Sequence, residues 1–473
     1  MKTLLIFPQT KTHYGLPNYP PLGLAYLAGM LKKENKDYDV LDLRLYSDWK
    51  NILIKKLKEN YELVGITCTT FDFNSSKELA RIIKENSKSK VILGGPHPTL
   101  IRKEILNNKD FDFGIIGEGE YTIIELLKAL ESKSLLKQIN GLVYRKEGSL
   151  IENNPRPLIE NLDSLPFPEY EKFDLKRYHG DTSMMGIIKR RTIMPLLSSR
   201  GCPFGCIYCS IGLIMGKKFR ARSPENIIAE IKHLKQKYNA GIIDFLDDNF
   251  TLDINRSKEI CKLMIKENIK IKWGLPNGIR VDKLDDELVL LMKKAGCHEI
   301  SLGIESVDNE ILKELKKGTT LETIENAIKI LRKNKIPIRA FFLIGSPKGT
   351  KQEVLNALTF AINNNLNESI WSMLVPYPST EFNKWVDKNH LWIVDNPEEK
   401  IINYADTGIG YIGSLYETTE FSAKEKEKVY EYVTKTWDKY ELDRSIKKKL
   451  IRKIKDYPPL YRFTKKIRDA IKK

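Results

Sequence analysis

The stretch S-S-R-G-C-P-F-G-C-I-Y-C-S, residues 198–210, places three cysteines within eight positions, at Cys202, Cys206 and Cys209. A structural zinc site in proteins takes four ligands. The remaining cysteines of the chain form no second close pair, and they are Cys68, Cys261 and Cys297. The spacing therefore favours a metal centre that is one protein ligand short, while a zinc site completed by a distant His or Cys stays open as an alternative.

The residues around the three cysteines suit a bulky metal centre. The loop directly follows an apolar run, so we expect it at the carboxyl end of a strand, and Gly201 and Gly205 give it backbone freedom. Three thiolates at this spacing suit three corners of a cubane iron–sulfur cluster. The fourth iron would then be open to a substrate or a cofactor.

The composition is that of a globular chain with two or three domains. The chain has 473 residues, 41% of them hydrophobic, and only six cysteines, which is too few for a disulfide framework. The apolar run at the N-terminus is shorter than a signal peptide requires, and no apolar stretch approaches the length of a membrane span. We therefore expect reduced thiols and a cytoplasmic location.

The net charge of +17 is concentrated at the C-terminus. Residues 444–473 contain 13 Lys or Arg and two Asp, which leaves only +6 for the other 443 residues. The basic character therefore belongs to a tail, and the body of the chain need not bind polyanions.

Residues 1–140 predict a Rossmann-like, doubly wound domain. Apolar runs rich in Val, Ile and Leu predict strands, at residues 3–7, 38–43, 63–68 and 90–95. Amphipathic stretches predict helices, at residues 23–34, 74–87 and 120–132. This alternation indicates a parallel sheet with helices on both faces, in which ligands bind beyond the carboxyl ends of the strands.

The rest of the chain divides into three parts. Residues 141–189 are rich in Pro and acidic residues and predict an extended linker. Residues 190–400 alternate again, and six strand–helix units predict a partial (β/α)6 barrel that resembles a TIM barrel, with function at the strand ends. Residues 401–473 predict a helical C-terminal region with a break at Pro458 and Pro459.

The cysteine spacing, with Tyr208 before the last cysteine, closely resembles that of the radical S-adenosylmethionine (SAM) enzymes. The resemblance implies that Cys202, Cys206 and Cys209 hold a 4Fe-4S cluster. It also implies that SAM chelates the open iron and is cleaved by one electron to a 5′-deoxyadenosyl radical. A fourth cysteine would block the site at which SAM binds.

Later segments strengthen this resemblance, which covers about residues 190–385. F-L-D-D-N-F at 245–250 and L-G-I-E-S at 302–306 end two expected strands, where the family places groups that contact SAM. The resemblance thus assigns SAM contacts to Glu305 and to three consecutive residues, Asp247, Asp248 and Asn249. Glu305 has an alternative role as the cap of the following helix.

The first 140 residues resemble the cobalamin-binding domain that precedes many radical SAM cores. The resemblance rests on P-P-L-G-L-A-Y-L-A-G-M-L (20–31), G-G-P-H-P-T-L (94–100) and G-I-I-G-E-G-E-Y-T (114–122). It implies cobalamin contacts at the strand ends by Thr67, Thr69, Gly94, Gly95 and His97. For His97, a hydrogen bond near the cofactor tail or within its turn is weighed against cobalt ligation. A Rossmann-like domain without cofactor is the alternative for the whole segment.

One departure from the cobalamin-domain pattern concerns the lower face of the cobalt. Domains of the methionine-synthase type carry Asp-x-His-x-x-Gly after the second strand, and that His ligates cobalt. Here Asp42 is followed by Arg44 at the His position. Arginine stays protonated and cannot serve as the cobalt ligand. We therefore expect bound cobalamin to lack a histidine ligand from this motif.

Taken together, the resemblances imply a cobalamin-dependent radical SAM enzyme. Methyl transfer to an unactivated carbon through methylated cobalamin is the expected reaction. A radical cyclisation, rearrangement or carbon–carbon coupling is one alternative, and a non-catalytic cobalamin or redox sensor is another. The expected partners are a small-molecule or lipid substrate and a reductant such as flavodoxin or ferredoxin.

The basic tail allows two interpretations. Ile446, Leu450 and Ile454 recur at helical spacing among Lys and Arg, as in a helix that lies on an anionic membrane surface. The same pattern fits a helix docked on the barrel with a solvated basic face. Nucleic acid is a weaker third partner, since no RNA-binding module accompanies the charge.

Overall fold

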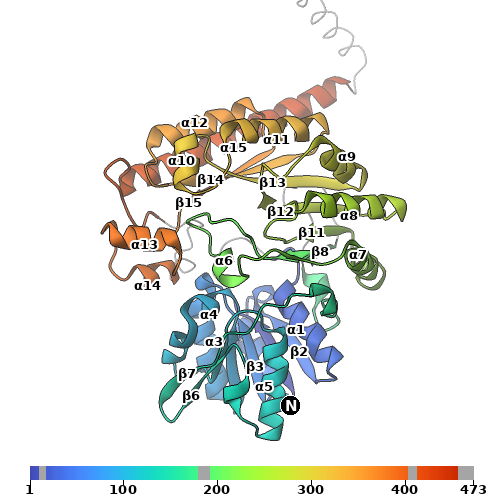
Figure 1. Ribbon diagram of the computed structural model, residues 1–473, viewed down its shortest axis with the longest axis vertical. Coiled ribbons are helices and arrows are strands. Elements are labelled where there is room, and N and C mark those ends of the chain that lie inside the picture. The colour runs from blue at the N-terminus through green and yellow to red at the C-terminus, as the bar shows by residue number, and fades with distance from the viewer. Residues whose placement is uncertain (10–16, 179–191, 403–412, 456–473) are drawn as a thin grey trace, which may run out of the picture.

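The protein, described here by a computed structural model, consists of two α/β domains arranged along its long axis (Figure 1). The structure describes residues 1–9, 17–178, 192–402 and 413–455. The N-terminal domain lies at one end and the barrel at the other, and helix α6 (Ile211–Ile214) lies between them (Figure 1). The expected order of a Rossmann-like domain, a partial barrel and a helical C-terminal segment is confirmed.

The N-terminal domain is built on a seven-stranded sheet in the order β2-β1-β3-β4-β5-β6-β7. Five strands run parallel, and they are β1 (Thr3–Phe7), β2 (Tyr38–Asp42), β3 (Leu63–Thr67), β4 (Lys90–Gly94) and β5 (Phe113–Ile115). The last two run antiparallel to their neighbours, and they are β6 (Leu142–Lys146) and β7 (Ser149–Glu152).

Helices cover both faces of this sheet because neighbouring strand residues point to opposite sides. Leu5 of β1 packs in one core, with α1 (Leu22–Lys33) and α5 (Glu120–Ser132). Leu4 and Ile6 pack in the other core. The helices on that side are α2 (Trp49–Leu57), α3 (Phe73–Asn86) and α4 (Pro96–Ile101). The apolar strands found in the sequence thus reflect burial on both faces.

The sheet extends beyond the boundary expected at residue 140. Residues 142–152, expected within the linker, form the β6–β7 hairpin and pair with β5. The two turn residues, Glu147 and Gly148, have φ angles of 51° and 81°, the left-handed conformation that tight hairpin turns require. The described part of the linker therefore begins after Glu152, and it packs against both domains rather than running free. Tyr170 donates a hydrogen bond to the Pro195 carbonyl of the barrel, at 3.4 Å, and the Glu169 amide donates to Ala25 of α1, at 2.9 Å.

The second domain is a six-stranded parallel sheet that curves into a partial barrel, in the order β8-β11-β12-β13-β14-β15. Its strands are β8 (Ile193–Leu196), β11 (Ile242–Phe245), β12 (Lys272–Ile279), β13 (Cys297–Glu305), β14 (Ile338–Ile344) and β15 (Glu368–Met373). The main outer helices are α7 (Pro224–Tyr238), α8 (Ile254–Lys266), α9 (Asp286–Lys294), α11 (Leu321–Lys333) and α12 (Lys351–Asn363). Short helix α10 (Asn309–Glu314) precedes α11. Ser223 caps the start of α7, because its side chain accepts a hydrogen bond from the Asn226 amide. Pro224 follows at the first helical position, where its lack of an amide hydrogen costs nothing.

Two of the described C-terminal helices pack on the barrel, α13 (Glu381–Lys388) and α15 (Ala423–Lys455), and α15 runs along α12 and β15. Helix α14 (Pro397–Ile402) contacts residues 70–72 of the N-terminal domain. Val429, Val433 and Trp437 of α15 are buried, so the first part of this helix is docked. The expected break at Pro458 and Pro459 lies outside the described residues. Within the described part of the chain, no helix is long and apolar enough to cross a membrane.

Candidate active site

The three cysteines lie in one loop that is closed at its base by two short strands. β9 (Ser199–Arg200) and β10 (Arg220–Ala221) pair antiparallel, and residues 201–219 between them contain every cysteine of the motif and helix α6. Gly201 begins the loop with a φ of 85°, and a Cβ there would lie 2.3 Å from the Lys218 carbonyl oxygen. Only glycine fits this close approach, because any side chain would collide with the returning strand.

The thiols of the loop are close enough to influence one another. Cys202 and Cys206 are half-buried and Cys209 is exposed, and all three are free. The pKa of the Cys209 thiol is raised to about 11, chiefly because the loop removes water from the sulfur atom and also because the Cys206 and Cys202 thiols are near. In the described part of the chain, no group of three or more His, Cys, Asp or Glu side chains is arranged to hold a metal ion. The donor chemistry, three neighbouring thiols on one loop, fits the thiolate ligation of an iron–sulfur cluster.

Asp247 holds the start of the cysteine loop. It follows β11 and is 2% exposed. Its two oxygens accept hydrogen bonds from the Ser198 amide at 2.7 Å and from the Ser198 and Ser199 hydroxyls at 2.5 Å each. Both oxygens are thus bound to the segment that leads into the loop, and the expected contact of Asp247 with SAM stays a prediction.

The next two residues of the segment differ from Asp247. Asp248 accepts a hydrogen bond from the Gly201 amide at 3.0 Å. Burial raises the pKa of the Asp248 carboxyl to about 6, although the Gly201 bond opposes the shift. The side-chain nitrogen of Asn249 is buried and has no hydrogen-bond partner among the described residues. Asp248 thus lies beside the loop, and the contacts of both side chains with SAM stay predictions.

Glu305 ends β13 in a strained conformation beside the cysteine loop. Its φ is 68°, and the pairing of β13 with β14 shifts register between Gly303 and Glu305. Its Oε1 accepts hydrogen bonds from Lys317 at 2.8 Å and from the Tyr208 hydroxyl at 3.0 Å. The alternative role as a helix cap is wrong, because Asp308 caps helix α10.

Two further residues brace the loop, and sequence reasoning missed them. The Arg280 guanidinium lies 3.6 Å from the centre of the Phe204 ring, inside the cysteine motif. Arg280 also donates to the Lys317 carbonyl oxygen at 2.6 Å. The only signal for Arg280 was the segment N-G-I-R-V-D at 277–282, which pointed to a strand end without a role for its arginine. Lys317 lies between two helices and carries no local motif.

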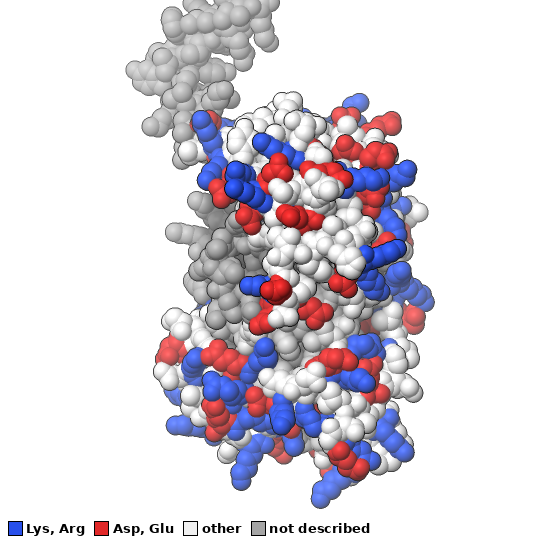
Figure 2. Space-filling model, turned by 90° about the vertical axis from the view of Figure 1, so that its left-hand side faces the viewer, with Lys and Arg blue, Asp and Glu red and all other residues white. Residues whose placement is uncertain are grey.

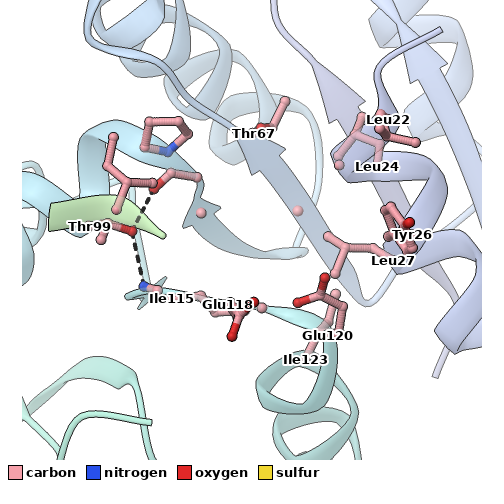
Figure 3. A pocket seen from close by; sticks show the side chains of 18 of the residues that line it. Leu22, Leu24, Tyr26, Leu27, Thr67, Thr99, Ile115, Glu118, Glu120 and Ile123 are labelled. Atoms are coloured by element: carbon pink, nitrogen blue, oxygen red, sulfur yellow. Dashed lines mark hydrogen bonds between the residues drawn. The ribbon is translucent and has the colours of Figure 1, made fainter. Parts of the chain in front are cut away.

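A cavity lies at the carboxyl ends of β1, β3, β4 and β5, between α1 and α5 (Figure 3). Its volume is about 280 Å³, and it is partly open to solvent. Three of the residues expected to contact cobalamin line it, and they are Thr67, Gly94 and Gly95. Thr99 joins two sides of the cavity, since its hydroxyl donates to the Gly95 carbonyl at 2.9 Å and accepts from the Gly117 amide at 3.0 Å (Figure 3).

The barrel domain closes the cavity from the other side. Leu197, Arg200, Ile214 and Met215 belong to the barrel domain and line the same space. Most of the surface is apolar, contributed by Leu5, Leu24, Ile66, Ile92, Ile115 and Ile123. The loop that carries the cysteines therefore forms part of the cavity wall.

Two family models match the chain. A model described as a B12 binding domain covers residues 16–127, and a model described as the radical SAM superfamily covers residues 196–361. An uncharacterised methyltransferase of Pyrococcus horikoshii is 34% identical over 404 residues, which are 84% of this chain and 85% of that protein. The chain belongs to the B12-binding radical SAM enzymes. Its cofactors are accordingly a 4Fe-4S cluster, SAM and cobalamin.

Other relatives place the chain among enzymes with this domain order. An anaerobic magnesium-protoporphyrin IX monomethyl ester cyclase of Cereibacter sphaeroides is 29% identical over 372 residues, 77% of this chain and 60% of that protein. The solved structure of the radical SAM methyltransferase TsrM from Kitasatospora setae has a TM-score of 0.70 at 20% identity, and covers 82% of this chain and 78% of TsrM. This likeness shows the fold of the B12-binding radical SAM enzymes.

The structure places two residues that were expected at the cobalamin site away from the cavity. His97 is 1% exposed, its ring packs against Phe73 with centres 4.4 Å apart, and its Nδ1 lies 3.3 Å from the Thr70 hydroxyl. The Thr69 hydroxyl donates to Asp72 at 2.6 Å. Neither side chain is among the residues that line the cavity, and their contacts with cobalamin stay predictions.

Arg44 is held beside the carboxyl ends of β1 and β2. Its guanidinium donates two hydrogen bonds to Asp42, at 2.9 and 2.6 Å, and lies 3.9 Å from the centre of the Phe7 ring. Asp42 also accepts a hydrogen bond from the Tyr178 hydroxyl at 3.0 Å. The Asp–Arg pair thus replaces the histidine of methionine-synthase-type domains with a fixed cation.

Proposed function

We propose that the protein is a cobalamin-dependent radical SAM methyltransferase that acts on an unactivated carbon of a small-molecule substrate. The observation that carries this proposal is the shared wall of the cavity. Thr67 and Gly94 of the B12-binding domain line one side, and Arg200 and Met215, which flank the cysteines, line the other. Cofactors held on the two domains would thus meet at one site.

Named residues would hold each cofactor. Cys202, Cys206 and Cys209 would bind the cluster, and Glu305 and Asp248 would orient SAM beside it. Thr67, Gly94 and Gly95 would contact cobalamin, with Gly95 at a φ of 110° letting the backbone approach a bulky ligand. When bound, the cofactors supply a hydrogen-abstracting radical from SAM and a transferable methyl group on cobalt. An external reductant such as flavodoxin or ferredoxin would deliver the electron.

A radical cyclisation is the second candidate function. It is favoured by one specific observation, the similarity to the protoporphyrin ester cyclase over 77% of this chain. In that case cobalamin would occupy the same cavity without delivering a methyl group. The substrate would then be changed in connectivity rather than in carbon count.

Product analysis separates these functions. The anaerobically reconstituted protein is incubated with SAM, hydroxocobalamin and dithionite, and the nucleoside products are separated. A methyltransferase forms 5′-deoxyadenosine and, only when cobalamin is present, S-adenosylhomocysteine. Formation of 5′-deoxyadenosine alone would support the cyclase. Absence of both products would support the non-catalytic cobalamin or redox sensor that the sequence also allowed.

We further propose that the basic tail brings the barrel to an anionic membrane surface. On the face shown in Figure 2, Lys and Arg are interspersed with Asp and Glu over both domains. The concentrated positive charge of the chain is instead that of residues 444–473. Membrane attachment would favour a lipid substrate, because the open end of the barrel would be held near the bilayer.

A further inference from the structure

We infer that Glu118, a residue of the B12-binding domain, positions the cysteine loop of the other domain and couples it to the cobalamin cavity. This inference rests on the cluster site proposed above. It adds a residue that lies 84 positions before the first cysteine of the motif, between β5 and α5 of the other domain.

The base of the cysteine loop contains two buried like charges. Arg200 of β9 and Arg220 of β10 are direct cross-strand partners, and they enclose residues 201–219. The side chains of Arg200 and Arg220 are 5% and 1% exposed. Like charges in this arrangement oppose the pairing of the strands. The closed loop therefore needs a buried anion between the two guanidinium groups.

Glu118 supplies that anion. Its Oε1 accepts hydrogen bonds from Arg200 at 2.7 Å and from Arg220 at 2.9 Å. Its Oε2 accepts a second hydrogen bond from Arg220 at 2.9 Å and one from the Ile159 amide at 2.7 Å. The carboxylate thus uses both oxygens to join the two strands that close the loop.

Glu120 plays a smaller part in the same cluster. It accepts one hydrogen bond, from Arg200, at 2.6 Å. Glu118 and Glu120 flank Gly119 at the start of α5, and both lie on the same side of the cavity (Figure 3). The anions that close the loop are therefore presented by one helix terminus of the other domain.

The same residues contact the space assigned to cobalamin. Glu118, Glu120 and Arg200 line the cavity, as does Met215, whose carbonyl oxygen accepts a hydrogen bond from Arg220 at 2.8 Å. Arg200 is followed directly by Gly201 and Cys202. A ligand in the cavity would thus restrict the groups that hold the first cysteine, and retention of the cluster should depend on cobalamin.

Iron release measures this coupling without turnover. The anaerobically reconstituted protein is mixed with a colorimetric iron(II) chelator, with and without hydroxocobalamin, and absorbance follows the loss of iron. We expect cobalamin to slow iron release from the unchanged protein. In Glu118→Gln, release should be about tenfold faster, as for other residues that support metal ligands, and cobalamin should no longer slow it.

Three variants make the result specific. Glu120→Gln should show an intermediate effect because it removes one of the hydrogen bonds to Arg200, and it also serves if Glu118→Gln does not fold. Glu118→Asp retains the charge and should restore part of the response to cobalamin. Glu169→Gln is the matched control, since Glu169 joins Lys32 and Lys237 of the two domains, at 2.6 and 3.2 Å, without touching the loop.

Equal iron release from Glu118→Gln, Glu169→Gln and the unchanged protein would overturn the inference. So would a cobalamin response that persists in Glu118→Gln. Failure of the unchanged protein to bind iron would instead overturn the proposed function, so the two failures are distinguishable.

Discussion

Lys317 donates a hydrogen bond to Glu305 at 2.8 Å, and the two side chains are only 8% and 9% exposed. Each charge is costly to bury alone, so each depends on the other. A Cβ at Gly303 of β13 would lie 2.9 Å from both the Lys317 nitrogen and the Glu305 oxygen. Glycine at this position therefore leaves room for the pair. The pair contacts Tyr208, which lies between two of the cysteines.

Lys317→Met should disable the use of SAM while sparing the cluster. The change leaves Glu305 as a buried carboxylate without its cation, so the carboxylate should shift or take up a proton. We expect 5′-deoxyadenosine formation to fall by at least about tenfold, with the iron content unchanged. The neighbouring Lys316→Met is the control, because Lys316 is exposed and pairs with Glu381 on the surface. Normal SAM cleavage by Lys317→Met would show that the pair is only structural.

Replacing Cys202, Cys206 and Cys209 together by Ala should abolish both iron binding and SAM cleavage. The unchanged protein should bind about four irons per chain after anaerobic reconstitution. Cobalamin binding to the variant, measured by its visible absorbance, reports whether the rest of the protein is intact. Retention of a cluster in the triple variant would mean that other residues hold it.

The parts of the site that could be predicted from the sequence are those with a local pattern. The cysteine spacing located the loop, and the apolar runs located β1, β3 and β11 because buried parallel strands are continuously apolar. The hairpin at residues 142–152 had a local signal in Glu147-Gly148, but the Pro-rich stretch that follows it masked the pattern.

Partners that meet only through folding could not be predicted. Arg200 and Glu118 are 82 positions apart and belong to different domains, so neither residue carries a local sign of the other. His97 has a local sign in its Gly/Pro-rich turn, but that sign does not show that the ring packs against Phe73.

The Co(II) form of bound cobalamin should show no nitrogen coupling from a histidine in its paramagnetic resonance spectrum. Arg44 occupies the position of the usual ligand and is held by two hydrogen bonds to Asp42. His97 is buried outside the cavity lining. Nitrogen splitting that disappears in His97→Ala would show that this assignment of the lower face is wrong. Failure to bind cobalamin would contradict the cofactor assignment itself.

Asp244→Asn should stabilise the protein at neutral and alkaline pH. Burial and, to a smaller extent, the neighbouring Glu299 raise the pKa of Asp244 to about 7, while Arg339 opposes the shift. Neither Asp244 oxygen has a hydrogen-bond partner in the described part of the chain. Between about pH 4 and 7 the folded state holds a proton that the unfolded state has released, so stability falls as pH rises through this window.

The expected gain follows from that sign. Each pKa unit corresponds to about 1.4 kcal/mol, so Asp244→Asn should raise the free energy of unfolding by a few kcal/mol at pH 8 and by little near pH 4. Urea unfolding at several pH values measures the difference.

Asp285→Asn provides a contrast: burial raises the Asp285 pKa, but hydrogen bonds from Lys258 and the Leu288 amide outweigh it and the pKa is lowered. The stabilisation that the Asp285 carboxylate gives the folded state should be present above the pKa of Asp285 in the unfolded chain, and it should be lost as pH falls. The prediction would be contradicted if the difference in free energy of unfolding between Asp244→Asn and the unchanged protein did not change with pH.

Deleting residues 446–473 should release the protein from anionic vesicles while leaving SAM cleavage intact. The deletion retains docked residues of α15: Val433 and Trp437 are buried, and Arg444 donates to the Leu366 and Asn367 carbonyls, at 2.5 and 2.8 Å. Each Lys or Arg near an anionic surface contributes about 1 kcal/mol, and this attraction weakens with salt because charges are screened over roughly 8 Å at physiological ionic strength. Flotation with phosphatidylserine vesicles at low and high salt measures it. If the full-length and truncated proteins float equally poorly at low salt, the tail is a docked or solvated helix, and the argument for a lipid substrate loses its support in the sequence.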